Sequence, residues 1–223
     1  MAKGVTFGSI HTNTNLNLIL QEEEIEPAAP KTNFVDIPGA DGSKDLTEAL
    51  GAGVKFEDGA ATWVFALYPA DDWATKRKQV SAAINGLRCN IVLDSDPNYV
   101  YSGRVSVENY KADKMLRQIT VKARMAPYKL EPTNRSVSRD DLTGSYKTLT
   151  LASGRMPVIP TITVQQATTL LFAGSTFAIT AGTHGLTGIV LSEGNNTLKA
   201  KLTDPETAEH TNISVSYKVG ELY

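Results

Sequence analysis

The apolar residues of this chain are divided into many short segments. The longest uninterrupted run is Trp63–Tyr68, and the other runs have four residues or fewer. Gly, Pro, Asn and Asp separate the segments, and these residues favour turns. A membrane-spanning helix needs about 20 apolar residues, so none is expected. Short apolar segments between frequent turns are typical of a chain built mainly from β-strands.

Composition excludes several classes of protein. The chain has 223 residues, of which 41% are hydrophobic, enough to bury a core of one large or two ordinary domains. The 22 Lys and Arg against 24 Asp and Glu give a net charge of −2, which argues against a strongly basic nucleic-acid surface. One Cys and three His exclude a disulfide scaffold or a Cys-rich zinc module. The first residues contain no unbroken apolar stretch of the roughly 7–15 residues that a signal peptide needs.

Short strands and one helix are predicted in the first half. Strands are expected at Val5–Phe7, Leu16–Leu20, Gly53–Phe56, Ala61–Leu67, Asn90–Leu93, Tyr99–Val107 and 116–126, with a turn at Asp94–Asn98. The helix is expected over Trp73–Leu87, with Asp71 or Asp72 as N-cap and Gly86 near its end. Its apolar face should carry Trp73, Val80, Ile84 and Leu87, and Lys76–Gln79 should face solvent.

A projecting hairpin is predicted before the Ala61–Leu67 strand. Pro27 and Pro30 interrupt both helix and strand ladder. The segment Asp36–Asp45 then contains Pro-Gly and Asp-Gly pairs, which suit chain reversals. We therefore interpret Phe34–Thr47 as a hairpin or arm.

The second half differs in kind from the first. A boundary is expected near Pro127–Pro132, and the residues beyond it are rich in Thr and short apolar pieces. Seven short strands without a helix pattern predict a β-sandwich. The expected strands are Leu149–Leu151, Pro160–Val164, Thr168–Phe172, Ser175–Thr180, Gly188–Leu191, Asn196–Lys201 and Asn212–Lys218, with turns at Ala173–Gly174, Ala181–Gly185 and Glu193–Asn195. The fold class is thus mainly β with one helix: an α+β domain at 1–130 and a β-sandwich at 131–223.

No pattern of catalytic residues is found. The chain has neither a phosphate-binding loop nor a nucleophile elbow. His11, His184 and His210 lie far apart in polar, turn-like contexts and are expected to be exposed, whereas Cys89 is expected to be a small buried side chain. Asp94–Asn98 resembles the start of a calcium loop but lacks its Gly and its closing Glu, so it is interpreted as a turn. No catalytic, cofactor-binding or metal-binding residue is predicted, and no enzyme activity.

The order of these elements resembles the siphophage distal tail protein family, which also occurs in phage-tail-like particles. The resemblance covers about the first 130 residues and rests on the order and spacing of several motifs. They are Ile37–Glu48, the strand Trp63–Leu67, the helix after it, Asp96–Val105 with its Tyr-x-Gly-Arg-Val, and Ala126–Lys129. In the second half, Met156–Ile162 and Leu191–Leu198 are similar to strands of the galectin-like sandwich in that family.

The resemblance implies a structural virion component at the tail tip, made in the host cytoplasm. Family members form a hexameric ring that links the tail tube to the tail-tip hub or fibre, and phage DNA passes through its lumen without specific binding. The 1–130 domain would form the ring and the galectin-like 131–223 domain would decorate it. Expected partners are further copies of the chain, the tail tube protein and the hub or fibre protein, with no cofactor and no membrane insertion. The residues expected at the interface between copies are Pro38, Asp41, Gly42 and Asp45.

Two other functions are kept as alternatives. The sandwich could be a carbohydrate-binding module for host cell-wall attachment, although the second half has no Trp and Phe172, Phe177 and Tyr217 fit core positions. A hydrolase would need carboxylates that converge from different strands. Adjacent pairs such as Asp71 with Asp72 and Asp140 with Asp141 point apart and suit that role poorly.

Overall fold

The computed structural model describes residues 3–49, 51, 53–67, 72–112, 117–206 and 210–223. Within these residues the chain forms strands and a single α-helix, and the strands pair mainly antiparallel. This confirms the predicted fold class of mainly β structure with one helix. The described part contains no helix long and apolar enough to cross a membrane.

The chain divides into two compact units. Unit 1 comprises Met1–Lys129 with Leu222–Tyr223, and unit 2 comprises Leu130–Glu221. The chain therefore leaves unit 1 after Lys129 and re-enters it with its last two residues. A short strand lies at each of these points: β10 (Tyr128–Leu130) where the chain leaves unit 1, and β19 (Gly220–Leu222) where it returns.

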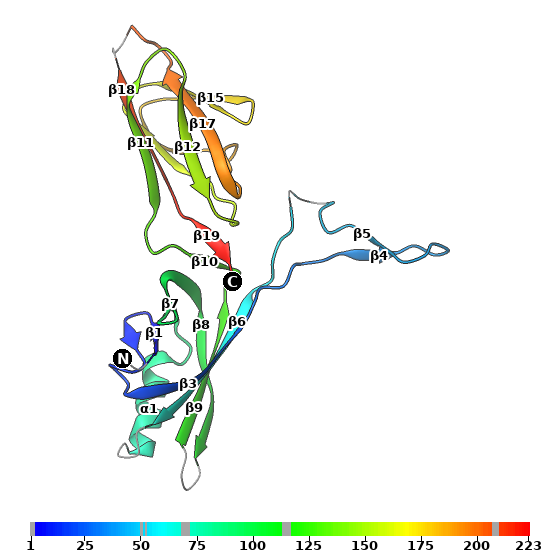
Figure 1. Cartoon of the computed structure of the whole chain (residues 1–223), viewed down its shortest axis with the longest axis vertical. Helices are drawn as coiled ribbons and strands as arrows, with labels where there is room; N and C mark the ends of the chain where they lie inside the picture. The colour runs from blue at the N-terminus through cyan, green and yellow to red at the C-terminus, as the bar shows by residue number, and fades with distance from the viewer. Residues whose placement is uncertain (1–2, 50, 52, 68–71, 113–116, 207–209) are drawn as a thin grey trace. The chain divides into compact units, whose positions relative to one another are not determined.

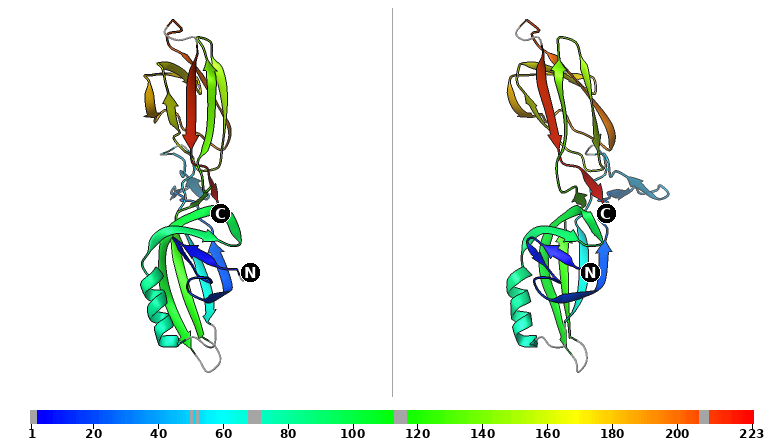
Figure 2. Two further views of the ribbon diagram at one scale, coloured as in Figure 1. Left: turned by 90° about the vertical axis from the view of Figure 1, so that its left-hand side faces the viewer. Right: turned by 60° about the vertical axis from the view of Figure 1, so that its left-hand side comes forward.

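Unit 1 is built on one twisted sheet with a helix on one face (Figures 1 and 2). The main path of the sheet runs in the order β2-β1-β7-β8-β9-β6-β3. Its elements are β1 (Val5–Phe7), β2 (Ile10–His11), β3 (Leu18–Glu26), β6 (Gly59–Leu67), α1 (Trp73–Ile84), β7 (Arg88–Leu93), β8 (Asp96–Ala112) and β9 (Arg117–Met125). A separate hairpin consists of β4 (Phe34–Asp36) and β5 (Ser43–Asp45).

The core of unit 1 lies between the sheet and α1. Alternate residues of β6 are buried, with Trp63 and Phe65 fully so, and Val80 and Ile84 of α1 pack into the same cluster. Phe7 of β1 meets Trp63 edge to face, with ring centroids 5.3 Å apart. This alternation is what a sheet with one buried face requires.

Helix α1 begins as predicted but ends earlier. The Asp72 carboxylate accepts a hydrogen bond from the Thr75 amide (2.8 Å), which makes Asp72 the N-cap; Asp71 lies outside the described residues. The helix stops at Ile84 because Asn85 is extended and Gly86 has φ +80°. The predicted end at Leu87 is thus wrong.

Lys76 is a second correction on this helix. The sequence predicts it on the solvent side, yet it is only 9% exposed. It lies four residues before Val80 and therefore falls on the buried face. Its Nζ donates to the carbonyl oxygen of Leu16 at 3.0 Å, which gives the buried ammonium group a hydrogen-bond partner.

Other strand boundaries in unit 1 also differ from expectation. Strand β3 continues through the acidic run to Glu26. Glu22, Glu24 and Glu26 are exposed at the sheet edge, whereas Ile25 packs against the core and the half-buried Glu23 accepts a hydrogen bond from Trp63 Nε1 at 3.3 Å. The predicted strand Gly53–Phe56 is wrong: Gly53 has φ +78° and only Phe56 forms a bridge, to Pro30. The turn after β7 is shorter than predicted, since β8 already begins at Asp96.

Unit 2 is a β-sandwich of two four-stranded sheets. One sheet has the order β11-β18-β13-β16 and the other β12-β17-β14-β15. The strands are β11 (Arg135–Leu142), β12 (Lys147–Ser153), β13 (Thr161–Val164), β14 (Thr168–Phe172), β15 (Ser175–Ile179), β16 (Gly182–Gly185), β17 (Gly194–Leu202) and β18 (Thr211–Tyr217). Phe172 and Tyr217 are buried in its core, as predicted, and Phe177 packs against it half-buried.

Three predictions for unit 2 are wrong. Strand β11 was missed because it is rich in charged residues and because a register shift between Arg139 and Leu142 interrupts the alternation; Val137 and Leu142 both pack inward. Gly182–Gly185 was expected to be a turn but pairs with β13. Gly188–Leu191 was expected to be a strand, yet only Leu191 forms a bridge, to Val158.

Removing the Ile84 side chain should test the packing of α1. Ile84→Ala should lower the free energy of unfolding of unit 1 by about 3 kcal/mol, because it removes buried methyl groups and leaves a cavity. Lys78→Ala, on the exposed face of the same helix, should change it by less than about 0.5 kcal/mol. Urea unfolding followed by Trp fluorescence measures both. An equal effect of the two variants would contradict the packing described.

Tyr223 should make the stability of unit 1 fall at alkaline pH. Its ring lies edge to face with Tyr101, 5.1 Å between centroids, and burial raises the pKa of Tyr223 to about 12. A free Tyr has a pKa of about 10, so the unfolded chain loses this proton first and stability falls between these two values. Tyr223→Phe should reduce the stability lost between about pH 10 and about pH 12. Tyr146→Phe changes an exposed ring and should leave this loss as large as in wild type. Equal losses in wild type and in both variants would refute this assignment.

Candidate assembly surface on the β4–β5 arm

The segment Phe34–Thr47, here called the arm, is a hairpin that extends away from the sheet of unit 1 (Figure 1). Its strands pair with Phe34 opposite Asp45 and Asp36 opposite Ser43. The amide of Ala40 donates to the carbonyl of Ile37 at 3.1 Å, and Gly39 between them has φ +84°. Pro38 followed by a Gly with positive φ is the sequence that a type II turn needs. The predicted hairpin is therefore confirmed.

The arm is held in shape by its own polar groups. At its base, the Leu46 amide donates to the Asn33 carbonyl (2.8 Å) and the Asn33 amide donates to the Thr47 hydroxyl (3.0 Å). The Ser43 hydroxyl donates to the Asp36 carboxylate at 2.6 Å. These bonds fix the backbone but bury no apolar surface.

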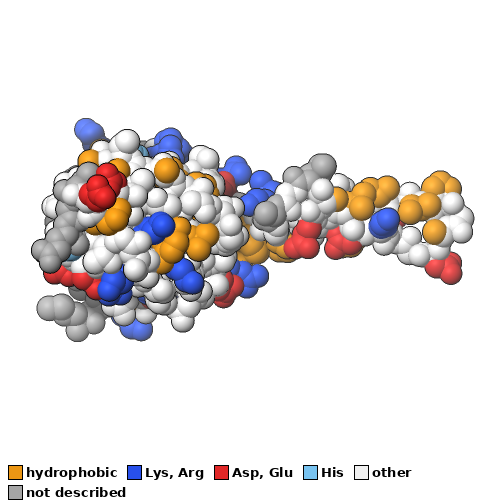
Figure 3. All heavy atoms as spheres, turned by 90° about the horizontal axis from the view of Figure 1, so that it is seen from above, with side chains coloured by type: hydrophobic (Ala, Val, Ile, Leu, Met, Phe, Trp, Pro, Cys, Tyr) orange, Lys and Arg blue, Asp and Glu red, His pale blue; other side chains and the backbone are white. Residues whose placement is uncertain are grey.

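Apolar side chains on the arm are exposed. Phe34 is 59%, Val35 41% and Ile37 47% exposed, and they are three of the six large hydrophobic residues that are exposed in the described part of the chain. Apolar and acidic side chains follow one another along the extension at the right of Figure 3. A lone two-stranded hairpin is only marginally stable in water, and clustered exposed apolar groups mark interaction sites. The arm therefore has the properties of a surface that is covered by a partner.

The four residues predicted for the interface all lie on the arm and are exposed. Pro38 begins the turn, and Gly42 has φ +70°, which favours glycine. Asp45 accepts hydrogen bonds from the hydroxyl and the amide of Thr47, which lower its pKa. Asp41 has no hydrogen bond or ion pair among the described residues, so its carboxylate is available to a partner. Contact with another copy remains a prediction for all four.

Phe34, Val35 and Ile37 were not predicted as site residues. The signal in the sequence is an apolar group inside a segment that is otherwise rich in turn-forming residues. Such a segment cannot build a core of its own, so its apolar residues remain at the surface.

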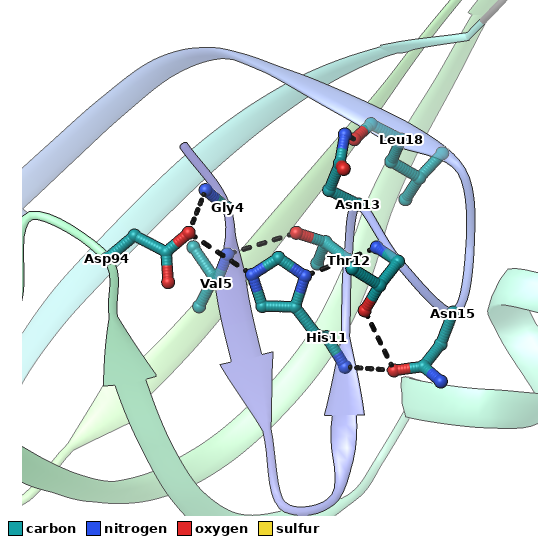
Figure 4. A network of polar contacts seen from close by, with 9 residues as sticks. Gly4, Val5, His11, Thr12, Asn13, Asn15, Leu18 and Asp94 are labelled. Atoms are coloured by element: carbon teal, nitrogen blue, oxygen red, sulfur yellow. Dashed lines mark hydrogen bonds and ion pairs between the residues drawn. The ribbon is translucent and has the colours of Figure 1, made fainter. Parts of the chain in front are cut away.

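The arrangement closest to a catalytic pair is His11 with Asp94, and it is structural (Figure 4). His11 Nε2 lies 3.2 Å from Asp94 Oδ2, and the Thr14 amide donates to Nδ1 at 3.2 Å. With Nδ1 accepting, a neutral ring carries its proton on Nε2 and donates it to Asp94. Asp94 also accepts from the Gly4 amide at 2.8 Å. Both ring nitrogens are occupied, so neither is left to take a proton from a nucleophile.

The other candidate groups give no site either. His11 and His184 lie in strands and are half-buried, which corrects the expectation of exposed turn histidines; His210 is exposed. Cys89 is half-buried, and burial raises the pKa of its thiol, which disfavours the reactive thiolate. In the described part of the chain, no group of three or more His, Cys, Asp or Glu side chains could hold a metal ion.

The fold is that of a hub protein from a phage adsorption apparatus. One similar solved structure is the SPP1 Dit (gp 19.1) protein, described as a paradigm of the hub adsorption apparatus in Gram-positive infecting phages. The match covers 98% of this chain and 99% of that chain, with a TM-score of 0.63 and 14% sequence identity. No family model and no curated protein matches the sequence. The resemblance seen in the sequence is thus confirmed at the level of the fold.

The apolar residues of the arm should not contribute to the stability of the isolated chain. Phe34→Ser and Ile37→Ser should leave the urea midpoint of unit 1 unchanged, because these side chains are already exposed. Leu18→Ser in β3 should lower it strongly, because Leu18 is fully buried. The measurement is made below the concentration at which copies associate. A large loss of stability in either arm variant would show that the arm packs against its own chain.

Proposed function

We propose that this chain is a structural component of a phage tail, a distal tail or baseplate hub protein that forms a hexameric ring at the tail tip. The ring links the tail tube protein to the tail-tip hub or fibre protein. The observation that carries the proposal is a fold shared with a phage hub protein over nearly the whole of both chains. The exposed apolar arm supports it, because a ring gives every arm a neighbouring copy to contact.

In the proposed ring, unit 1 forms the contacts between copies and unit 2 decorates it. Pro38, Asp41, Gly42 and Asp45 lie at the interface with the next copy, beside Phe34 and Ile37. DNA passes through the lumen without specific binding, so tight binding of duplex DNA at physiological salt would count against this role. The proposed role is structural and requires neither catalysis nor a cofactor. The proposed location is the virion tail tip, after synthesis in the host cytoplasm.

A second candidate function is carbohydrate binding by unit 2. One observation favours it: a hollow of about 400 Å³ on the β11-β18-β13 sheet, lined by polar groups that include Ser138, Thr163, Asn212 and Ser214. Hydroxyl and amide groups of this kind can bind the hydroxyls of a sugar. The lining has no aromatic ring on which a sugar could stack. Millimolar or tighter binding of cell-wall saccharides to the chain, lost in Ser138→Ala with Ser214→Ala, would favour this function.

Assembly in solution tests the proposed function. At micromolar concentration, sedimentation velocity and negative-stain imaging should show rings of six copies, because each copy offers the arm as a heterologous contact. Phe34→Ser with Ile37→Ser should abolish the rings by removing apolar area from that contact.

The matched control is Ile159→Ser with Val190→Ser. These residues of unit 2 are 44% and 42% exposed, close to the exposure of Ile37, and their loss should leave the rings intact. A wild-type chain that stays monomeric, even with tail-tube and hub proteins added, would contradict the proposed function.

A further inference from the structure

Three arginines lie side by side across three neighbouring strands of unit 1. In the strand register, Arg88 of β7 is opposite Arg104 of β8, and Arg104 is opposite Arg124 of β9. All three are exposed, on the face of the sheet opposite the buried Val105 and Val121. Neighbouring strands are only about 4.8 Å apart, and like charges directly opposite one another destabilise a sheet. We call this set the arginine row.

The arginine row lines a hollow of about 610 Å³. Gly86, Gly103 and the exposed Ala126 also line it. Gly86 has open space where a side chain would stand, so the hollow is accessible from solvent there. We call this hollow the basic groove, after its three guanidinium groups.

The basic groove has more positive charge than its own residues neutralise. Arg124 Nε donates to Asp58 Oδ2 at 2.7 Å, and Arg104 Nη1 donates to the Gly86 carbonyl at 2.7 Å. The guanidinium group of Arg88 has no hydrogen bond or ion pair among the described residues. Asp58 is the only carboxylate in the lining, against three arginines. Guanidinium groups bind carboxylates in strong, directional pairs, so the groove suits an acidic ligand.

The arm is an acidic and apolar segment of matching charge. Within Phe34–Thr47 there are three carboxylates, Asp36, Asp41 and Asp45, and one base, Lys44. Its exposed apolar side chains would lose contact with water if the arm lay against another protein surface. In the described part of one copy, no hydrogen bond or ion pair joins the arm to the groove. The charged side chains of the arm and of the basic groove thus do not pair with each other within one copy and can pair with another molecule.

We propose that the basic groove of one copy receives the arm of a second copy of this chain. This rests on the proposed self-association and names the surface that receives the arm. The contact joins two different surfaces, so it is head-to-tail and can repeat from copy to copy until a ring closes. A nucleic-acid backbone would also satisfy the arginines, but it would leave the apolar side chains of the arm exposed.

Charge reversal tests the proposal. Arg88→Glu and Asp41→Arg change two exposed residues without partners in their own copy, so each variant should fold. Each should weaken self-association about tenfold or more, because like charges then face each other across the contact. The double variant carries both reversals and should regain association to within about threefold of wild type. An equimolar mixture of the two single variants should associate equally well. Lys78→Glu on α1 is the control for a charge reversal outside the contact and should leave self-association unchanged.

The outcomes separate this proposal from the proposed function. If wild type forms rings and the single reversals leave them unchanged, the arm does not lie in the basic groove, although the ring stands. If the double variant is weaker than either single one, the two surfaces do not meet. If wild type never associates, both proposals fail. If Arg88→Glu abolishes binding of a short DNA duplex and leaves association unchanged, the groove is a nucleic-acid site and this proposal is overturned.

Discussion

The architecture of unit 1 depends on the burial of one face of its sheet. Trp63 and Val121 are fully buried in one cluster with Ile84 of α1. Since successive side chains of a strand point to opposite faces, Lys122 and Arg124 of β9 must then face outward. A slip of one residue in the pairing of β9 would bury these charges, so the core fixes the register and the register creates the arginine row.

Features that depend on nearby residues could be predicted from the sequence. The start of α1 was predictable because Asp72 caps an amide three residues away. The arm was predictable because Pro38-Gly39 specifies a turn within four residues. The core positions of Phe172 and Tyr217 followed from alternation within single strands.

Features that depend on distant pairing could not be predicted. The spacing of Lys76 to Val80 places it on the buried face, but the carbonyl of Leu16 that accepts its hydrogen bond lies 60 residues away in sequence. Strand β16 forms because β13 offers a partner, although Gly182–Gly185 alone is typical of a turn. Arg88, Arg104 and Arg124 are widely separated in sequence, and only strand pairing brings them into one row. No local pattern in the sequence marks that row as a site.

The proposed role follows from complementary surfaces on one chain. The acidic, apolar arm and the basic groove are both exposed, and their opposite charges suit a contact between copies. The most direct test is a cryo-electron microscopy map of the assembled wild-type protein. We expect a ring of six copies in which each arm lies along Arg88, Arg104 and Arg124 of its neighbour. Arms that extend freely into solvent, or basic grooves that contact nothing, would contradict it.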